Sequence, residues 1–274
     1  MSKINWAVLV SCNILAAILF FSWLNTQTVV TEADGDRRLQ FTEQDSFWKD
    51  VDIAVFKSLN GQLKDSKSSQ MFWAHSNRRI FDLVSAFSMI FVYAVFILRG
   101  SQEEKLERIK FGLYMSLCML AALAGVQILH AIFDVGRLSP TKLPVEGAIR
   151  LSDFDYINFD LKDASKTSFP GDHSAVLFMI ATFISFYARK FYALAAVIVA
   201  LLFVLPRMVG GGHWFTDIFV GGGAITLITA SWALCTPLKN KIMSMLNKPG
   251  ILVMKITGKV IPALRPPQEA VSDS

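Results

Sequence analysis

Six apolar segments that are almost free of charge constrain the fold of this chain more than any other feature. An α-helix needs about 20 largely apolar residues to cross the hydrocarbon core of a membrane. Four of the segments reach that length, whereas the fourth and fifth in chain order are shorter. The segments are Ile4–Leu24, Ile80–Leu98, Phe111–Phe133, Ser174–Ala188, Phe191–Pro206 and Ile218–Leu238. We predict an all-α, polytopic membrane protein folded as a bundle of six transmembrane helices.

The composition agrees with a membrane protein. Hydrophobic residues make up 53% of the chain and the mean hydropathy is +0.43. Charged residues make up 18%, where an ordinary globular protein has about 25%. These values argue against a soluble two-domain enzyme and against a disordered chain. The formal net charge is +5, and in so hydrophobic a chain a small basic excess indicates loops that face anionic lipid, not a nucleic acid.

The lysines and arginines of the short loops predict the orientation, because short cytoplasmic loops are enriched in these residues. They gather at 99–110, at 189–190 and over 239–265, which places these segments and both termini in the cytoplasm. The long loops 25–79 and 134–173 then face the opposite side of the membrane.

These boundaries predict one six-span domain over residues 1–238 and a basic cytoplasmic tail over 239–274. Within the long loop 25–79, the apolar residues from Phe47 to Phe56 predict an amphipathic helix on the membrane surface. That helix is either an element that guides a substrate or a simple cap on the bundle.

One short segment that precedes the last span, 206–217 with the sequence PRMVGGGHWFTD, gathers side chains suited to phosphate chemistry. Asp217 follows His213 by four residues, and a carboxylate that holds one imidazole nitrogen leaves the other nitrogen as a nucleophile. Arg207 offers a planar fork that matches phosphate oxygens. The glycines up to Gly212 let the backbone approach an oxyanion and offer N–H donors. The alternative is a glycine-rich turn that carries a structural histidine.

A second segment, SFPGDHS at 168–174, precedes the fourth apolar segment. Its Pro-Gly turn predicts a helix that begins near His173. The N–H groups at such a helix start, together with Gly171, are suited to bind a phosphate, and a histidine there can donate a proton to a leaving group. The alternative is a simple helix cap made by Asp172.

Together, these two segments resemble the second and third signature motifs of the phosphatidic acid phosphatase type 2 superfamily. The third motif is Ser-Arg, five residues, His, three residues, Asp; this chain matches it at Arg207, His213 and Asp217, with a proline in place of the serine. The second motif is Pro-Ser-Gly-His, which this chain matches at Pro170 and His173.

The first motif of the superfamily, Lys, six residues, Arg-Pro, is poorly kept. Ile132 stands where the lysine belongs and Ser139 where the arginine belongs. Arg137, Lys162 and Lys166 are the candidates to supply the missing positive charge, and the sequence does not choose between them.

At the positions where this chain departs from the superfamily pattern, it resembles one branch of the superfamily. That branch moves a phosphate from undecaprenyl diphosphate onto lipid A in Gram-negative bacteria. The positions include the residues from Asn77 to Asp82, Arg-x-Ser-Pro at 137–140, and the string 162–166. The resemblance covers roughly Ile4–Leu238. It implies an inner-membrane protein with a periplasmic active site, and undecaprenyl diphosphate, lipid A and membrane lipids as partners.

The resemblance also implies a mechanism that uses no metal and no cofactor. His213 would attack the terminal phosphorus and form a phosphohistidine, and His173 would protonate the leaving group. Arg207 and backbone amides at Gly171 and Gly212 would bind the phosphate, and Asp217 would orient His213. Two alternatives remain at this stage: a lipid phosphatase that uses water as acceptor, and a non-catalytic membrane scaffold.

Overall fold

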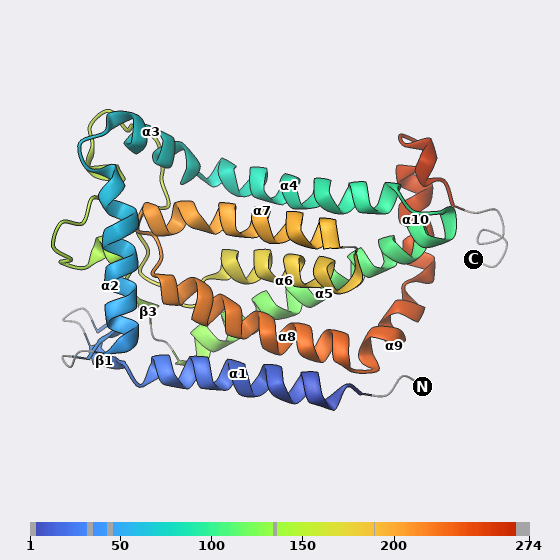
Figure 1. Cartoon of the computed structure of the whole chain (residues 1–274), viewed down its shortest axis with the longest axis horizontal. Helices are drawn as coiled ribbons and strands as arrows, with labels where there is room; N and C mark the ends of the chain where they lie inside the picture. Colours follow the sequence, from blue (N-terminus) through green and yellow to red (C-terminus); the bar gives the residue numbers. More distant parts are fainter. Residues whose placement is uncertain (1–3, 32–34, 43–45, 134–135, 189, 267–274) are drawn as a thin grey trace.

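The computed structural model describes residues 4–31, 35–42, 46–133, 136–188 and 190–266. Most of the chain is helical, which confirms the predicted class. Six helical rods lie side by side along the long axis of the molecule (Figure 1). They are α1 (Trp6–Leu24), α4 (Arg79–Leu98), α5 (Gln102–Phe133), α6 (Asp172–Tyr187), α7 (Lys190–Val209) and α8 (Gly223–Cys235), the last preceded by a π-helical segment, Asp217–Gly222.

Five of these rods are long and apolar enough to cross a membrane, so the expected sixth span is not confirmed. They are α1, α4, Gln102–Gln127 of α5, α7, and Asp217–Cys235. The exception is α6, which is apolar but has only 16 residues. Because α6 is packed against α5, α7 and α8, much of its surface faces protein.

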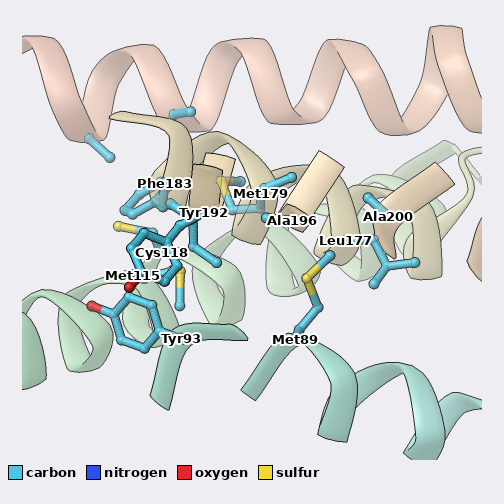
Figure 2. Packing of buried hydrophobic residues seen from close by; sticks show 14 of the residues in the cluster. Met89, Tyr93, Met115, Cys118, Leu177, Met179, Phe183, Tyr192, Ala196 and Ala200 are labelled. Carbon is cyan, nitrogen blue, oxygen red and sulfur yellow. The ribbon is translucent and has the colours of Figure 1, made fainter. Parts of the chain in front are cut away.

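The main core lies between α4, α5, α6, α7 and α8 (Figure 2). Large side chains such as Phe183 and Met179 of α6 meet small ones such as Ala196 and Ala200 of α7, and all four are at most 2% exposed. Alternation of large and small residues lets facing helices interdigitate. This packing fixes the start of α6 relative to the end of α7, where the two predicted motifs lie.

One end of the bundle, which we call the site end, carries the long loops. There α2 (Phe47–Asn60) runs across the ends of the long helices (Figure 1), which confirms a helix over the apolar residues that begin at Phe47. The next elements are a 3-10 turn, Gly61–Leu63, and α3 (Lys67–Ser76). The loop between α5 and α6 adds two further 3-10 turns, Pro140–Lys142 and Leu151–Asp153.

A small three-stranded sheet at the site end is an addition to the all-α prediction. β1 (Gln27–Thr31) pairs antiparallel with β2 (Arg37–Phe41), and β2 pairs parallel with β3 (Gly136–Arg137). The β-branched residues of TVVT in β1 favour an extended strand. The pairing joins the loop after α1 to the loop after α5, and it fixes the backbone at Arg137.

The opposite end carries α9 (Leu238–Met245) and α10 (Asn247–Thr257), which pack against α5. A last 3-10 turn covers Pro262–Leu264. The expected basic tail is therefore helical over much of its length, and its residues 267–274 lie outside the described part of the chain.

Candidate active site

The two sequence motifs meet at the site end. His173 lies in the first turn of α6, and His213 lies in the turn between α7 and the π-helical segment. The backbones of the two motifs are joined directly, because the Gly171 N–H donates to the Asp217 carbonyl at 2.9 Å. The two imidazoles are close enough to interact electrostatically. The structure thus brings together the two histidines that the sequence analysis selected.

The ring of His213 is held by the backbone of the other motif. Its Nδ1 lies 2.8 Å from the carbonyl oxygen of Ser168. Because a carbonyl oxygen only accepts hydrogen bonds, Nδ1 carries the hydrogen and the lone pair of the neutral ring is on Nε2. Asp217 was expected to hold this ring, but its Oδ2 lies 3.7 Å from Nδ1, too far for a hydrogen bond. The Asp217 carboxylate therefore lies beside Nδ1, while the Ser168 carbonyl accepts its hydrogen.

Asp217 belongs to a buried network of charges. Its Oδ2 accepts from the Trp214 N–H at 2.7 Å, and its Oδ1 accepts from the Arg137 guanidinium. The same guanidinium donates to Asp52 of α2 at 2.8 Å and to the Thr216 hydroxyl at 2.8 Å. Thr216 in turn donates to Asp52 through its N–H at 2.8 Å and its hydroxyl at 2.6 Å.

Arg137 connects both groups that face Nδ1 of His213. Its guanidinium pairs with Asp217, and its carbonyl accepts from Ser168, from the N–H at 2.8 Å and from Oγ at 3.1 Å. The side chain is 2% exposed. Three aromatic rings surround the guanidinium, with centroids 5.1 to 5.4 Å away: Trp23, Phe41 and Trp214. This environment makes Arg137 an anchor for the His213 ring.

Burial sets the charge balance of this network. Burial raises the pKa of the Asp52 carboxyl, and the nearby charge of Asp217 adds to that rise, while Arg137 opposes it. Burial alone would lower the pKa of the Arg137 guanidinium, but the carboxylates of Asp217 and Asp52 outweigh that effect and raise it. Arg137 therefore stays charged between two acids.

The second histidine lies in a more open cluster centred on Asp82 of α4. The Asp82 carboxylate accepts from the Arg207 guanidinium and, at 2.6 Å, from the Lys162 ammonium. Its Oδ1 lies 4.0 Å from Nδ1 of His173. Arg207 is further held by the carbonyl of Asn77 at 3.2 Å. Two cations and a histidine thus converge on one carboxylate that is 27% exposed.

The glycines have a different role from the one expected. The Gly212 N–H donates to the Arg207 carbonyl at 2.9 Å, and the Gly171 N–H is used by Asp217. Neither N–H is free to bind a phosphate in this structure. A Cβ on Gly212 would collide with the backbone oxygen of Lys162. Glycine is required there so that the turn can pack against the α5–α6 loop.

The three basic candidates from the loop after α5 have separate surroundings. Arg137 is buried between carboxylates, and Lys162 reaches Asp82. Lys166 is 63% exposed, and its ammonium lies 4.0 Å from Asp36. Of the three, only Lys162 joins the Asp82 cluster.

Two acidic residues of the site were not selected from the sequence. Asp52 shares one face of α2 with Phe56 and Asn60, four residues apart, and all three are buried. An acidic residue on the apolar face of an amphipathic helix is a sequence feature that could have identified Asp52 as a candidate site residue. Asp82 was visible as the one charge in an otherwise apolar span, a position that marks a functional candidate.

Comparisons with known proteins show the family of this chain. The model of the PAP2 superfamily matches residues 111–241. The chain is 32% identical over 244 residues to the protein named lipid A 1-diphosphate synthase from Escherichia coli (strain K12), covering 89% of this chain and 94% of that protein. The chain belongs to the PAP2 superfamily. No solved structure matches it.

The region that matches the PAP2 superfamily holds Arg137, His173, Arg207, His213 and Asp217. The acids Asp52 and Asp82 lie before it, on α2 and α4. The site of this PAP2 protein is therefore completed by two carboxylates from outside the matched region.

Proposed function

We propose that this PAP2 protein is a phosphotransferase that moves the terminal phosphate of undecaprenyl diphosphate to the 1-phosphate of lipid A through a phosphohistidine. The observation that carries the proposal is the bond from His213 Nδ1 to Ser168, which leaves Nε2 available as a nucleophile. The similarity to a relative named for a lipid A diphosphate product supports the acceptor.

In the first step, Nε2 of His213 attacks the terminal phosphorus in line. A P–N bond forms, and the bond from phosphorus to the bridging oxygen breaks. The electron pair leaves on the bridging oxygen as undecaprenyl monophosphate. Burial lowers the pKa of His173 to about 4 in the resting site, so His173 takes up a proton as the anionic donor binds beside it and then passes that proton to the leaving group. Arg207 stabilises the charge that spreads over the equatorial oxygens.

In the second step, an oxygen of the lipid A 1-phosphate attacks the same phosphorus and the P–N bond breaks. His173, now neutral, takes up the proton of the acceptor. His213 is released for another cycle, and the product carries a diphosphate. Because Asp82 pairs with Arg207 in the resting site, phosphate binding exchanges a carboxylate for a phosphoryl group at that guanidinium.

The decisive experiment follows label from the terminal phosphate of undecaprenyl diphosphate, with and without lipid A, in the purified protein. Label on lipid A supports the transfer. Label found only as free inorganic phosphate, at equal rates in both samples, contradicts it and establishes a phosphatase that uses water. No turnover with either acceptor would favour a non-catalytic scaffold.

Substitution of His213 tests the nucleophile separately from the acceptor. We expect His213→Ala to lose at least about 10⁴-fold in turnover and to trap no label on the protein. The matched control is His75→Ala, which should trap label on the protein without acceptor as the wild type does, since His75 is exposed and stacks on Phe159. A labelled protein that persists in His213→Ala would overturn the assignment.

We further propose an inner-membrane location with the site end in the periplasm, as the basic short loops indicate. Single cysteines at Lys166 and Lys259 test this in a variant without the native cysteines. A membrane-impermeant thiol reagent added to spheroplasts should label the cysteine at 166 and not the one at 259. The reverse pattern would place the site end in the cytoplasm.

A further inference from the structure

A polar cavity of about 700 Å³ lies at the site end, formed by the loop between α5 and α6. This volume is in the range of small-molecule binding sites. Most of its lining is polar, unlike the membrane-facing surfaces of the bundle. Its polar lining residues are Lys142, Arg150, Ser152, Asn158, Asp160 and Asp163.

The walls of this cavity are tied to the active site. Lys142 follows Thr141, whose hydroxyl donates to the Gly211 carbonyl at 3.0 Å. Leu161 and Asp163 flank Lys162, whose ammonium pairs with Asp82 in the site. The Lys162 N–H also donates to the Asn77 carbonyl at 3.0 Å. The loop that forms the cavity is therefore bonded to the turn after α7 and to Asp82 of the active site.

The lining suits a ligand that carries hydroxyl groups and a negative charge. Lys142 is exposed and makes no ion pair among the described residues. Arg150 lies 3.8 Å from an exposed carboxylate, Asp153, and its buried Nε has no hydrogen-bond partner in the part of the chain that the structure describes. Asn158 and Asp160 add a neutral amide and an acceptor, which hydroxyl groups can use.

The second acid of the lining does not repel such a ligand strongly. Asp163 accepts from both the N–H and the hydroxyl of Ser152 at 2.7 Å, and it is 2% exposed. Its charge is thus compensated by two donors inside the wall. Lys142 and Arg150 remain on the cavity side, Lys142 without an ion pair among the described residues and Arg150 3.8 Å from Asp153.

We infer that this cavity binds the phosphorylated sugar headgroup of the acceptor lipid, with Lys142 and Arg150 on a second phosphate remote from the reacting one. The inference rests on the proposed transfer reaction and names the part of the acceptor that the protein recognises. Neither a water acceptor nor the polyprenyl donor carries a sugar headgroup that would fill such a polar cavity.

The test compares donor chemistry with acceptor binding in the double variant Lys142→Gln/Arg150→Gln. Label incorporation from undecaprenyl diphosphate without acceptor should match the wild type, which also shows that the variant folds. The KM for lipid A should rise about tenfold, as expected for lost charge-assisted hydrogen bonds, with kcat nearly unchanged. The matched control, Lys64→Gln, removes an exposed charge from the turn after α2 and should leave KM unchanged.

A second acceptor sharpens the result. With lipid A that keeps only the 1-phosphate, the wild-type KM should rise by a similar factor. The KM of the double variant should be the same for this acceptor as for complete lipid A. If the double variant transfers phosphate to lipid A with the wild-type KM, the inference is wrong while the proposed function stands. If the wild type itself labels on His213 but never transfers to lipid A, both are overturned.

Discussion

The two histidines of the site each lie near a carboxylate, but the surroundings of the two pairs differ. On the His213 side, Asp52, Arg137 and Asp217 are 0%, 2% and 0% exposed, and each makes short bonds to the others or to backbone. On the His173 side, Asp82 is 27% exposed and is shared between two cations. One network is closed to solvent and the other is open to it.

We relate this difference in exposure to the roles proposed for His213 and His173. Buried charges cannot lose a partner without a large cost in free energy, so they hold a fixed geometry. Partly exposed ion pairs are worth little, so they can exchange partners. We propose that the closed network aims the nucleophile, and that the open cluster is the part that exchanges its partners for an incoming phosphate.

Removing the centre of the closed network gives the largest expected effect. Arg137→Met leaves the carboxylates of Asp52 and Asp217 together in a dry interior without a counter-ion. We expect a loss of about 3–5 kcal/mol in the free energy of unfolding, because breaking a buried ion pair strands its partner. Thermal unfolding in detergent should show a much lower midpoint than the wild type, and label incorporation at His213 should disappear.

The control for that variant is Arg79→Met, which removes an exposed arginine at the start of α4. It should unfold close to the wild-type temperature. If Arg137→Met is as stable and as active as the wild type, the two carboxylates do not depend on this guanidinium and the closed network has no positioning role.

Asp52→Asn separates positioning from stability within the same network. Arg137 keeps Asp217 as a partner in this variant, and the raised pKa of Asp52 means that its ionised form is costly to bury. The folded-state pKa lies above the unfolded one, so this cost is complete above the folded pKa, decreases as the pH falls below it, and is gone below the unfolded pKa. At neutral pH we expect an unfolding temperature equal to or above that of the wild type.

The activity of Asp52→Asn should nevertheless fall about ten- to hundredfold, since a small displacement of a reacting group is that costly. The measurement is the rate of label incorporation at His213, with Asp50→Asn, an exposed acid on the same helix, as the matched control. An Asp52→Asn protein that unfolds early and keeps its activity per folded molecule would show that Asp52 only stabilises α2.

The residues of the two motifs were more accessible to sequence analysis than the long-range contacts that hold them. His173, Arg207, His213 and Asp217 were selected from motif spacing, and the structure places them at one end of the bundle. Local spacing suffices for such residues, because each motif is continuous in the chain. Asp82 gave a signal as well, since a charge inside an apolar span is costly unless it is used.

The closed network could not be read from local patterns, because its contacts are long-range. Asp52 meets Arg137 across 85 positions of the chain, and only the crossing of α2 over the helix ends brings them together. The bonds that the Gly171 and Gly212 N–H groups make within the protein were not predicted, for a related reason. Glycine-rich turns offer N–H groups, but the fold determines whether a carbonyl such as that of Arg207 takes them first.

Neutralising Asp82, the carboxylate of the open cluster, should have a moderate effect, and this change should tighten the binding of the donor. In Asp82→Asn, an incoming phosphate no longer competes with a carboxylate for Arg207 and Lys162, so the KM for undecaprenyl diphosphate should fall about two- to fivefold. The value of kcat should fall too, because His173 loses its acidic neighbour. Steady-state kinetics that resolve KM from kcat test this, with Asp50→Asn as the exposed control. A higher KM would mean that Asp82 helps to bind the donor.

The smallest effect distinguishes two lysines of one loop. Lys162→Gln removes a cation whose ammonium lies 2.6 Å from Asp82, whereas Lys166→Gln removes one that is 63% exposed and 4.0 Å from Asp36. Because an exposed ion pair at that distance contributes little, Lys166→Gln should change kcat/KM for undecaprenyl diphosphate by less than about twofold. Lys162→Gln should lower it about fivefold, as one of the two cations that an incoming phosphate would meet. If Lys166→Gln proves the more damaging, the exposed lysine and not the Asp82 cluster receives the donor, and the open half of the site extends toward β2.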